Sequence, residues 1–310
     1  MTPWKKPLLC IAGPTASGKS ALALALCQRI GGEIVSCDSM QIYRGCDIAT
    51  ARPTRAEQEA VPHHLIDICD PNQRFSAAQW GREAKKCCEE IESRGNIPVI
   101  CGGTGFWLRA LLAPESLSDV APDPQIRSGL QAELEKVGAA KMHEKLALLD
   151  ANAAARLHPN DSFRVVRALE IALRETERIT VEMPEISASE SEFAARIYAL
   201  DWPRATLYER IDRRVEAMIE AGFEAELRAL TQKWGREAPA LSGVGYKQML
   251  PVLGGETGFE AGVENWKRDS RRYAKRQITY FSHQLPVTWL DSGRDLLESV
   301  TWIVKDFKVR

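Results

Sequence analysis

A glycine-rich segment near the N-terminus carries the residue types that bind phosphate. Residues 13–20 read GPTASGKS and fit the pattern G-x-x-x-x-G-K-[ST]. Glycines let the backbone wrap around phosphate oxygens, a lysine adds a full positive charge, and a serine hydroxyl can bind Mg²⁺. The spacing therefore predicts a site for a ligand that carries a diphosphate, formed by Gly13, Pro14, Thr15, Ala16, Ser17, Gly18, Lys19 and Ser20, with Ser20 on the metal. Whether this ligand is a nucleotide such as ATP stays open on these residues.

A carboxylate follows the next predicted strand. Residues 33–36 form that strand, and Asp38 comes two positions after it. Ligands of open parallel sheets bind at the carboxyl ends of the strands, so Asp38 is expected at the ligand-binding edge. A carboxylate there can hold a metal ion through water or accept a proton from a nucleophile. It can also simply cap the turn that follows, and the residues alone do not separate these three roles.

Short apolar runs alternate with helical patterns over the first 115 residues. The pattern predicts strands at 7–12, 33–36 and 97–101 and helices at 19–30 and 80–93. This alternation is typical of an α/β fold, in which a parallel sheet has helices on both faces. The loop at 13–20 lies between a strand and a helix, which is the setting that a phosphate-binding P-loop requires. We therefore predict a P-loop NTPase-like core.

The composition changes after Ala113, where prolines at 114, 122 and 124 interrupt the chain. The residues that follow, to about 182, are rich in Ala, Leu, Glu, Arg and Lys, and they predict helices at 130–136, 141–149, 151–157 and 162–174. We divide the chain into a first core segment, 1–115, a helical insertion domain, 116–194, and a second core segment, 195–310. The last segment is predicted to hold strands at 196–200 and 287–290, a helical stretch at 204–232 interrupted near Gly222, and a basic helix at 262–283.

The overall composition excludes several classes of protein. The chain has 310 residues, 41 basic and 42 acidic side chains, and 45% hydrophobic residues. These values exclude a disordered chain, a collagen and a disulfide mini-protein, and they argue against a surface coated with basic charge. No run of 18 apolar residues is present, so no membrane helix is expected. The first apolar run is too short for a signal peptide, and we expect a cytoplasmic protein.

Cysteines and histidines suggest no metal centre. All eight cysteines lie within the first 101 residues without a C-x-x-C pair, so we expect reduced and mostly buried thiols rather than a zinc site. His63 and His64 are adjacent in an extended Pro-His-His-Leu segment, where neighbouring side chains point to opposite sides. Joint metal binding is therefore not expected, and a structural role or a place in a substrate wall is favoured.

Several ordered segments resemble the tRNA dimethylallyltransferase family. After GPTASGKS come CDSMQIYRGCDIATARPT (37–54), VPHHLIDICDP (61–71), VICGGTGFWLRALL (99–112), FRVVRALEI (163–171), SGVGYKQM (242–249) and RRYAKRQITYF (271–281). The resemblance covers nearly the whole chain. Ala49 and Arg52 stand where the family usually has glycine and lysine, and Trp107 where tyrosine is commoner. These departures can alter the shape of a pocket, but they remove none of the predicted catalytic groups.

The resemblance implies an alkyl transfer rather than a phosphoryl transfer. The family moves a dimethylallyl group from dimethylallyl diphosphate to N6 of the adenosine immediately 3′ of the anticodon in tRNA. The P-loop and Mg²⁺ would then hold the leaving diphosphate, and Arg214 would add a second cation. Asp38 would bind the adenine amine and accept its proton, which assigns Asp38, Thr15 and Arg214 as the catalytic residues.

The resemblance also implies a surface for the tRNA anticodon stem-loop. The target base must leave its stack to reach a pocket, as base-modifying enzymes require. The implied contacts are Asp38, Ser39, Met40, Gln41, Thr104, Arg127, Phe163, Arg164, Val165, Val166, Arg167, Ser242, Gly243, Val244, Gly245, Tyr246, Lys247, Lys275, Arg276, Gln277, Ile278, Thr279, Tyr280, Phe281 and Ser282. Charge independently supports the RNA contacts predicted for 275–282, because the neighbouring residues 264–276 hold six basic side chains and two acidic ones.

Other functions remain open on the sequence. A P-loop small-molecule kinase would use ATP and a phosphoryl acceptor, and Arg164, Arg167 and Arg174 could serve its lid. A non-catalytic RNA-binding ATPase would bind ATP and RNA without changing the RNA, and some relatives could prenylate free adenine nucleotides. The helical insertion and the basic helix favour tRNA, since a free nucleotide needs neither. The family leads us to expect a monomer.

Overall fold

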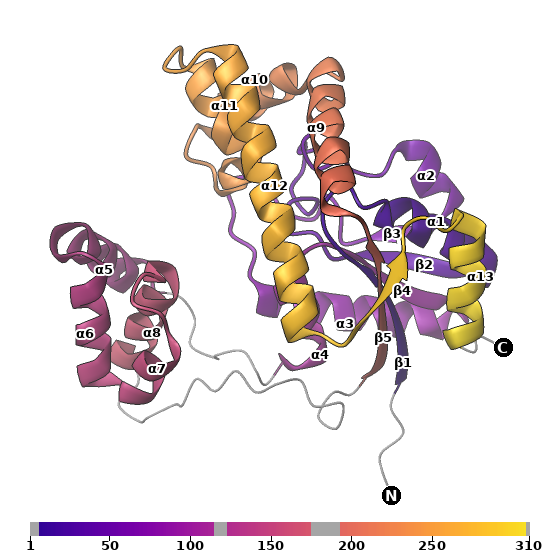
Figure 1. Ribbon diagram of the computed structural model, residues 1–310, viewed down its shortest axis with the longest axis horizontal. Helices are drawn as coiled ribbons and strands as arrows, with labels where there is room; N and C mark the ends of the chain where they lie inside the picture. Colours follow the sequence, from indigo (N-terminus) through magenta and orange to yellow (C-terminus); the bar gives the residue numbers. More distant parts are fainter. Residues whose placement is uncertain (1–5, 115–122, 175–192, 308–310) are drawn as a thin grey trace, which may run out of the picture. The chain divides into compact units, whose positions relative to one another are not determined.

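A six-stranded parallel sheet forms the centre of the protein. The computed structural model describes residues 6–114, 123–174 and 193–307. The strand order is β3-β2-β4-β1-β5-β6, and every neighbouring pair is parallel (Figure 1). The strands are β1 (Lys6–Ala12), β2 (Gly32–Ser36), β3 (His63–His64), β4 (Ile97–Gly102), β5 (Phe193–Asp201) and β6 (Val287–Asp291). The predicted α/β fold class is confirmed.

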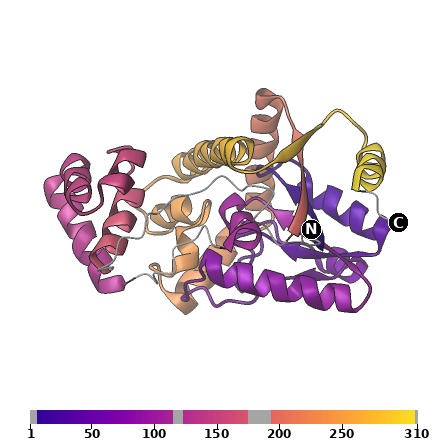
Figure 2. The ribbon, with the colours of Figure 1, turned by 90° about the horizontal axis from the view of Figure 1, so that it is seen from below.

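Helices cover both faces of this sheet (Figure 2). The core helices are α1 (Lys19–Ile30), α2 (Arg55–Ala60), α3 (Ala77–Ser93), α4 (Gly105–Leu112), α9 (Arg204–Glu220), α10 (Phe223–Trp234), α11 (Tyr246–Leu253), α12 (Phe259–Gln284) and α13 (Leu296–Phe307). On one face, Leu22 of α1 and Ile303 of α13 share a buried cluster with Ile11 of β1. On the other, Trp80 of α3 is fully buried and donates its indole N–H to Ser36 O at 3.0 Å. The β-strands therefore carry apolar residues on both sides, as buried parallel strands do.

Some elements have no counterpart in the sequence prediction, namely α2, β3, α4, α11 and α13. Two of them, α2 and β3, are only six and two residues long, too short for a periodic pattern. Seven of the eight residues of α4 are buried, so this helix has no polar face to mark its period. Helix α11 contains Pro251, a residue that usually ends helices. Helix α13 is rich in β-branched and aromatic residues, which favour strands.

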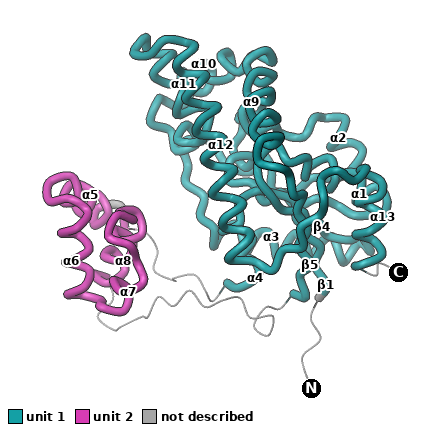
Figure 3. Tube along the Cα trace, viewed as in Figure 1, with its two compact units in different colours: residues 1–114, 186–310 teal, residues 115–185 magenta. Residues whose placement is uncertain are grey.

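The chain forms two compact units, which are coloured separately in Figure 3. One contains the sheet and the helices around it. The other contains α5 (Pro124–Val137), α6 (Ala139–Leu149), α7 (Ala151–Arg156) and α8 (Ser162–Arg174). The predicted start of the insertion at 116 lies outside the described residues, and its predicted end at 194 falls inside β5. Among the described residues, no helix is long and apolar enough to cross a bilayer.

The helical unit has its own core and one buried carboxylate. Met142, Leu146 and Leu169 are fully buried in its apolar cluster. Glu170 is also fully buried, and it accepts hydrogen bonds from Arg127 at 2.6 Å, Arg167 at 2.8 Å and the Asp123 backbone N–H at 2.5 Å. A buried charge is tolerated because these partners replace its water.

A second buried carboxylate joins strands at the amino-terminal edge of the sheet. Glu33 of β2 is 5% exposed and accepts hydrogen bonds from Arg94 at 2.8 Å and Asn96 at 2.6 Å, while His64 Nε2 lies 2.6 Å from it. Burial by itself raises the pKa of Glu33, but these hydrogen bonds outweigh burial and hold the pKa at about 2.

The depressed pKa of Glu33 predicts a pH-dependent contribution to stability. Because the folded pKa lies below the ordinary value of 4.5, the contribution is present above about pH 4.5 and is lost as the pH falls towards 2. Glu33→Gln should lower the free energy of unfolding at pH 7 by about 3 kcal/mol, measured by urea denaturation. The difference in the free energy of unfolding between the wild type and the variant should become smaller below pH 4.5. Glu59→Gln, on an exposed helix face, is the control, and a gap that stays constant with pH would contradict the assignment.

Candidate active site

The predicted P-loop connects β1 to α1 and has the backbone geometry of an anion site. Gly13 has φ 130° and Gly18 has φ 94°, conformations that other residues rarely adopt. Gly18 is the N-cap of α1, and no side chain caps this helix. The amides of the first turn are therefore available to a negatively charged ligand, which the helix dipole also favours.

Three side chains from outside the loop hold its backbone. Gln277 of α12 accepts a hydrogen bond from Thr15 N–H at 2.9 Å and donates to Gly103 O at 2.9 Å. The Trp202 indole donates to Ser17 O at 2.8 Å, and Arg210 Nε donates to Ala16 O at 2.8 Å. The loop is therefore fixed before a ligand arrives. Since the Thr15 amide already has a protein partner, any contribution of this residue to a ligand must come from its hydroxyl.

Cations gather on the outer side of the loop. A cavity of about 390 Å³ is lined by Ala16, Gly18, Lys19, Ser20, Arg210, Arg213 and Arg214. Burial lowers the pKa of Lys19, and the nearby charge of Arg214 lowers it further. Burial also lowers the pKa of Arg214, against the opposing effect of Asp38. Lys19 and Arg214 are both half-buried, two nearby cations repel each other, and an anion bound between them relieves that repulsion.

Contacts between the ends of β2 and β4 position Asp38. Cys37 N–H donates to Cys101 O at 2.7 Å, and Thr104 N–H donates to Cys37 O at 3.1 Å. The two backbones approach so closely at Gly102 that a Cβ there would lie 2.0 Å from Cys37 O. Asp38 therefore leaves the sheet in a fixed direction, next to Thr104.

The two carboxylate oxygens of Asp38 differ in their surroundings. Met40 N–H donates to Asp38 Oδ1 at 2.9 Å, so the capping role considered for this residue is present. Oδ2 has no hydrogen-bond partner among residues 6–114, 123–174 and 193–307. Thr104 Oγ1 accepts from Ser39 N–H at 3.0 Å and so steadies the same turn. The carboxylate is thus oriented through one oxygen, which leaves the second for a ligand.

A second cavity, of about 290 Å³, connects Asp38 to the cationic side of the loop. It shares Lys19, Ser20 and Arg214 with the first cavity. Its other lining residues include Thr15, Asp38, Ser39, Met40, Gln41, Ala49, Thr50, His63, Cys101, Ile211, Val215, Met218, Ser242, Gly243, Val244, Trp266, Ser270, Tyr273, Arg276 and Gln277. An anion held at the shared residues would therefore lie beside a chamber that contains the carboxylate.

The sequence analysis did not identify all of the lining residues. Arg210 and Arg213 lie on the same helix as Arg214, and their spacing of three and four residues could have indicated a shared side. Trp266, Ser270 and Tyr273 were also missed. They precede Gln277, which was predicted as an RNA contact, at intervals of four, three and four along α12, and this spacing marks one stripe of that helix. Burial raises the pKa of Tyr273, and the charge of Asp38 raises it further, so the hydroxyl keeps its proton.

Part of the predicted RNA-contact set needs correction. The side chains of Val165, Val166, Tyr246 and Phe281 are buried and pack inside the protein, so they do not offer side chains to RNA in this structure. Gln277 is also buried, but it lines the second cavity. The resemblance assigned whole segments, whereas a helix turns only some of its residues outward. The exposed members are Phe163, Arg164, Ser242, Lys247, Lys275, Arg276, Thr279 and Ser282, and the half-buried ones include Thr104, Arg127, Arg167, Ile278 and Tyr280.

The adjacent histidines have separate surroundings, as expected. His63 lines the second cavity, and its Nδ1 lies 2.8 Å from Val61 O. Burial lowers the pKa of His63. His64 instead contacts Glu33. His63 thus belongs to the cavity wall, and His64 belongs to the network at the amino-terminal edge of the sheet.

Comparison with known families gives a consistent result. A family model described as IPP transferase matches residues 41–284, and one described as isopentenyl transferase matches residues 7–69. The tRNA dimethylallyltransferase of Carboxydothermus hydrogenoformans is 40% identical over 95% of this chain and 94% of its own length. That of Bacillus subtilis is 41% identical over 93% of this chain and 91% of its own length.

Solved structures agree with the sequence matches. A crystal structure of the tRNA isopentenylpyrophosphate transferase of Bacillus halodurans has a TM-score of 0.73 and 38% identity, and the match covers 98% of this chain and 97% of that one. A eukaryotic dimethylallyltransferase acting on tRNA has a TM-score of 0.76 at 26% identity, and the match covers 98% of this chain and 79% of that one.

The bridge made by Gln277 predicts a loss of anion affinity when it is removed. Gln277→Leu keeps the size of the side chain but leaves the Thr15 N–H and the Gly103 carbonyl without partners. The affinity for inorganic diphosphate with Mg²⁺, measured by calorimetry, should fall about tenfold. His283→Ala, an exposed position on the same helix, should not change it. Equal affinities for the two variants would show that the bridge does not support the loop.

Proposed function

This chain belongs to the IPP transferase family of tRNA dimethylallyltransferases, and we propose that it prenylates the adenosine immediately 3′ of the anticodon. In this reaction a dimethylallyl group leaves dimethylallyl diphosphate and joins N6 of the adenine. The main structural support is the pair of cavities that meet at Lys19, Ser20 and Arg214, one cationic and one containing Asp38. Such a pair can hold a diphosphate donor and an acceptor base in contact. The known relatives favour neither a kinase nor a binding ATPase.

Asp38 acts on the acceptor amine in this proposal. An exocyclic adenine amine is a weak nucleophile, because its lone pair is delocalised into the ring. The unpartnered Oδ2 of Asp38 accepts a hydrogen bond from N6–H and takes the proton as the nitrogen–carbon bond forms. The turn contact from Met40 keeps the carboxylate pointed in one direction, so little reorganisation accompanies the step.

The P-loop side stabilises the leaving group. As the new bond forms, the bond between C1 of the dimethylallyl group and the diphosphate oxygen breaks, and the oxygen keeps the electron pair. Negative charge therefore grows on the diphosphate, where Lys19, Arg214 and the first-turn amides of α1 lie. Thr15 lines the second cavity, and its hydroxyl would complete the cradle.

Mg²⁺ fits this site mainly as a partner of the diphosphate. The described residues contain no cluster of three or more His, Cys, Asp or Glu side chains that could bind a metal ion. Ser20 is exposed and lines both cavities, so its hydroxyl can contribute one ligand while phosphate oxygens and water supply the rest. When bound, Mg²⁺ would neutralise charge on the diphosphate.

The RNA surface on α12 is narrower than its charge count indicates. Lys267 pairs with Glu216, Arg271 with Asp212, and Arg268 and Arg272 with Asp269. Lys275 and Arg276 have no carboxylate within ion-pair distance in the part of the chain that the structure describes, and Arg276 lines the second cavity. We propose that these two residues contact the backbone of the anticodon loop while the target base enters the cavity.

A reconstituted reaction tests this function. Purified protein, Mg²⁺, dimethylallyl diphosphate and unmodified tRNA should yield N6-dimethylallyladenosine, detected by nucleoside mass spectrometry after digestion of the tRNA. We also propose that the protein acts as a monomer, since residues of one chain line both cavities. Consumption of ATP with a small-molecule acceptor instead would favour a kinase, and tRNA binding without a covalent change would favour a binding ATPase.

Asp38→Asn is predicted to remove the proton acceptor while keeping the shape of the side chain. Transfer should slow by at least about 100-fold, and the affinity for inorganic diphosphate should stay within about twofold. Single-turnover rates and calorimetry measure the two effects separately. Asp70→Asn, which alters an exposed ion pair with Arg44, serves as the control. Near-normal turnover of Asp38→Asn would rule out the assigned role.

Arg214→Gln is predicted to weaken the donor side. The affinity for dimethylallyl diphosphate should fall by about tenfold or more, because a half-buried cation is lost from the point where the cavities meet. Arg213→Gln should have a smaller effect, since Arg213 is exposed and lines only the first cavity. Equal effects of the two substitutions would contradict a special role for Arg214.

A further inference from the structure

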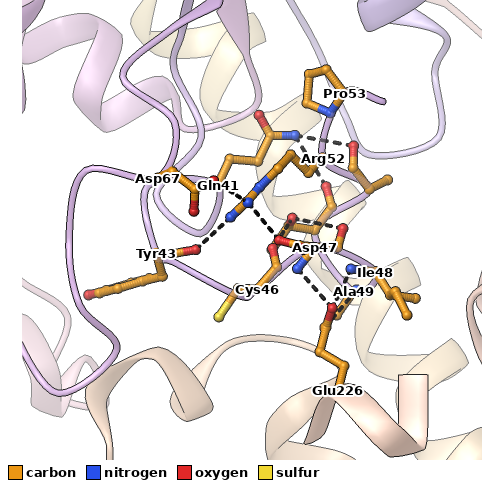
Figure 4. A network of polar contacts seen from close by, with 12 residues as sticks. Gln41, Tyr43, Cys46, Asp47, Ile48, Ala49, Arg52, Pro53, Asp67 and Glu226 are labelled. Carbon is orange, nitrogen blue, oxygen red and sulfur yellow. Dashed lines mark hydrogen bonds and ion pairs between the residues drawn. The ribbon is translucent and has the colours of Figure 1, made fainter. Parts of the chain in front are cut away.

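The side chain of Glu226 lies among the backbone amides of a distant loop (Figure 4). Glu226 is on α10, and its Oε2 accepts hydrogen bonds from Asp47 N–H at 2.8 Å and Ile48 N–H at 2.6 Å. Its Oε1 accepts from Ala49 N–H at 3.4 Å. Three consecutive amides thus converge on one carboxylate, whose charge makes these hydrogen bonds stronger than a neutral acceptor would.

The same carboxylate holds a second segment. Tyr246 is fully buried, and its hydroxyl donates to Glu226 Oε1 at 2.6 Å. Burial raises the pKa of Tyr246, and Cys46 and Glu226 raise it further, so the hydroxyl keeps the proton that it donates. Tyr246 begins α11, directly after the residues 242–244 that line the second cavity.

The loop held by Glu226 reaches the cavity wall through Thr50 and Gln41. Thr50 Oγ1 donates to Cys46 O at 2.6 Å. Gln41 Nε2 donates to the carbonyls of Thr50 and Ala51 at 3.2 and 3.3 Å, and its Oε1 accepts from Ser36 Oγ at 2.9 Å. The amide of Gln41 is therefore locked, with its nitrogen directed at the loop. Ser36, Gln41 and Thr50 all line the cavity that contains Asp38.

An arginine holds the loop from its other side. Arg52 donates to Tyr43 O at 2.8 Å and pairs with Asp47 at 2.7 Å and with Asp67 (Figure 4). Two charged side chains thus hold the loop, and Glu226 also contacts Tyr246, the first residue of α11. Glu226 itself does not line the cavity, so it can act only through the residues that it holds.

We propose that Glu226 is a positioning residue for the acceptor base: it fixes the loop 46–50 and the segment 242–246 as the two walls that receive the adenine beside Asp38. This inference rests on the proposed function. It assigns no chemical step to Glu226. It predicts that loss of this carboxylate weakens capture of the flipped adenosine while the diphosphate side, which Glu226 does not contact, stays intact.

Glu226→Gln tests the proposal with little change in size. An amide nitrogen would replace one acceptor oxygen. It would face either the loop amides, which only donate, or the Tyr246 hydroxyl, which would lose the acceptor of its present hydrogen bond. Glu224→Gln is the matched control, since Glu224 is on the same helix, exposed, and paired with Arg228. Tyr246→Phe is a second variant that removes a single donor to Glu226 and keeps the buried ring.

The assay uses the full chain and two anticodon stem-loop RNAs, one with adenosine and one with an abasic nucleotide at the target position. For Glu226→Gln, the KM and the Kd of the adenosine RNA should rise about tenfold. The Kd of the abasic RNA and the Kd of inorganic diphosphate should remain within about twofold of wild type. Tyr246→Phe should change the same two quantities in the same direction by a smaller factor, and Glu224→Gln should match wild type.

Three outcomes would overturn the proposal. The first is an unchanged KM and Kd for the adenosine RNA in Glu226→Gln. The second is a parallel loss of diphosphate and abasic-RNA affinity in both variants, which would show that Glu226 only supports the fold. The third is the absence of N6-dimethylallyladenosine with the wild-type protein, which would remove the proposed function and this inference with it. If the wild-type protein is active and Glu226→Gln has unchanged KM and Kd for the adenosine RNA, only the inference is removed.

Discussion

The close approach of two backbones at the ends of β2 and β4 governs the geometry of the site. A side chain at position 102 would collide with Cys37 O, so only glycine lets the two strands continue side by side into their loops. The contact brings Asp38 next to Thr104 and places both beside the P-loop that follows the neighbouring strand β1. The acceptor side and the donor side therefore meet at one edge because three parallel strands end there.

Charge is distributed unequally around this edge. Half-buried and exposed cations collect on the outer side of the P-loop, whereas the chamber beyond it contains one oriented carboxylate and mostly neutral side chains. An alkyl transfer between a diphosphate and an amine needs this division, since negative charge leaves on one side and a proton on the other. Elsewhere, Glu33 and Glu170 are buried carboxylates that join elements through several donors, and Glu226 does the same for the cavity walls.

The sequence predicted the parts of the site that have a local signature. The P-loop, the strand before Asp38 and helix 19–30 follow from spacing and periodicity, and they agree with the structure. Contacts between distant segments have no such signature: nothing local indicates that Gln277 bonds to Thr15 or that Glu226 caps a loop near residue 47. The resemblance to a family indicated which segments contact RNA but not which side of each helix is exposed. Residues such as Val165 were therefore included although their side chains pack inward.

The bond between Thr15 and Gln277 joins residues 262 positions apart, and it has a consequence during synthesis. A growing chain exposes its phosphate-binding sequence early, but the helix that steadies the loop is translated last but for β6 and α13. Until α12 has left the ribosome, the loop lacks the partner that fixes its first amide, and the second cavity lacks a wall. Nascent chains that still lack α12 therefore cannot assemble the complete site.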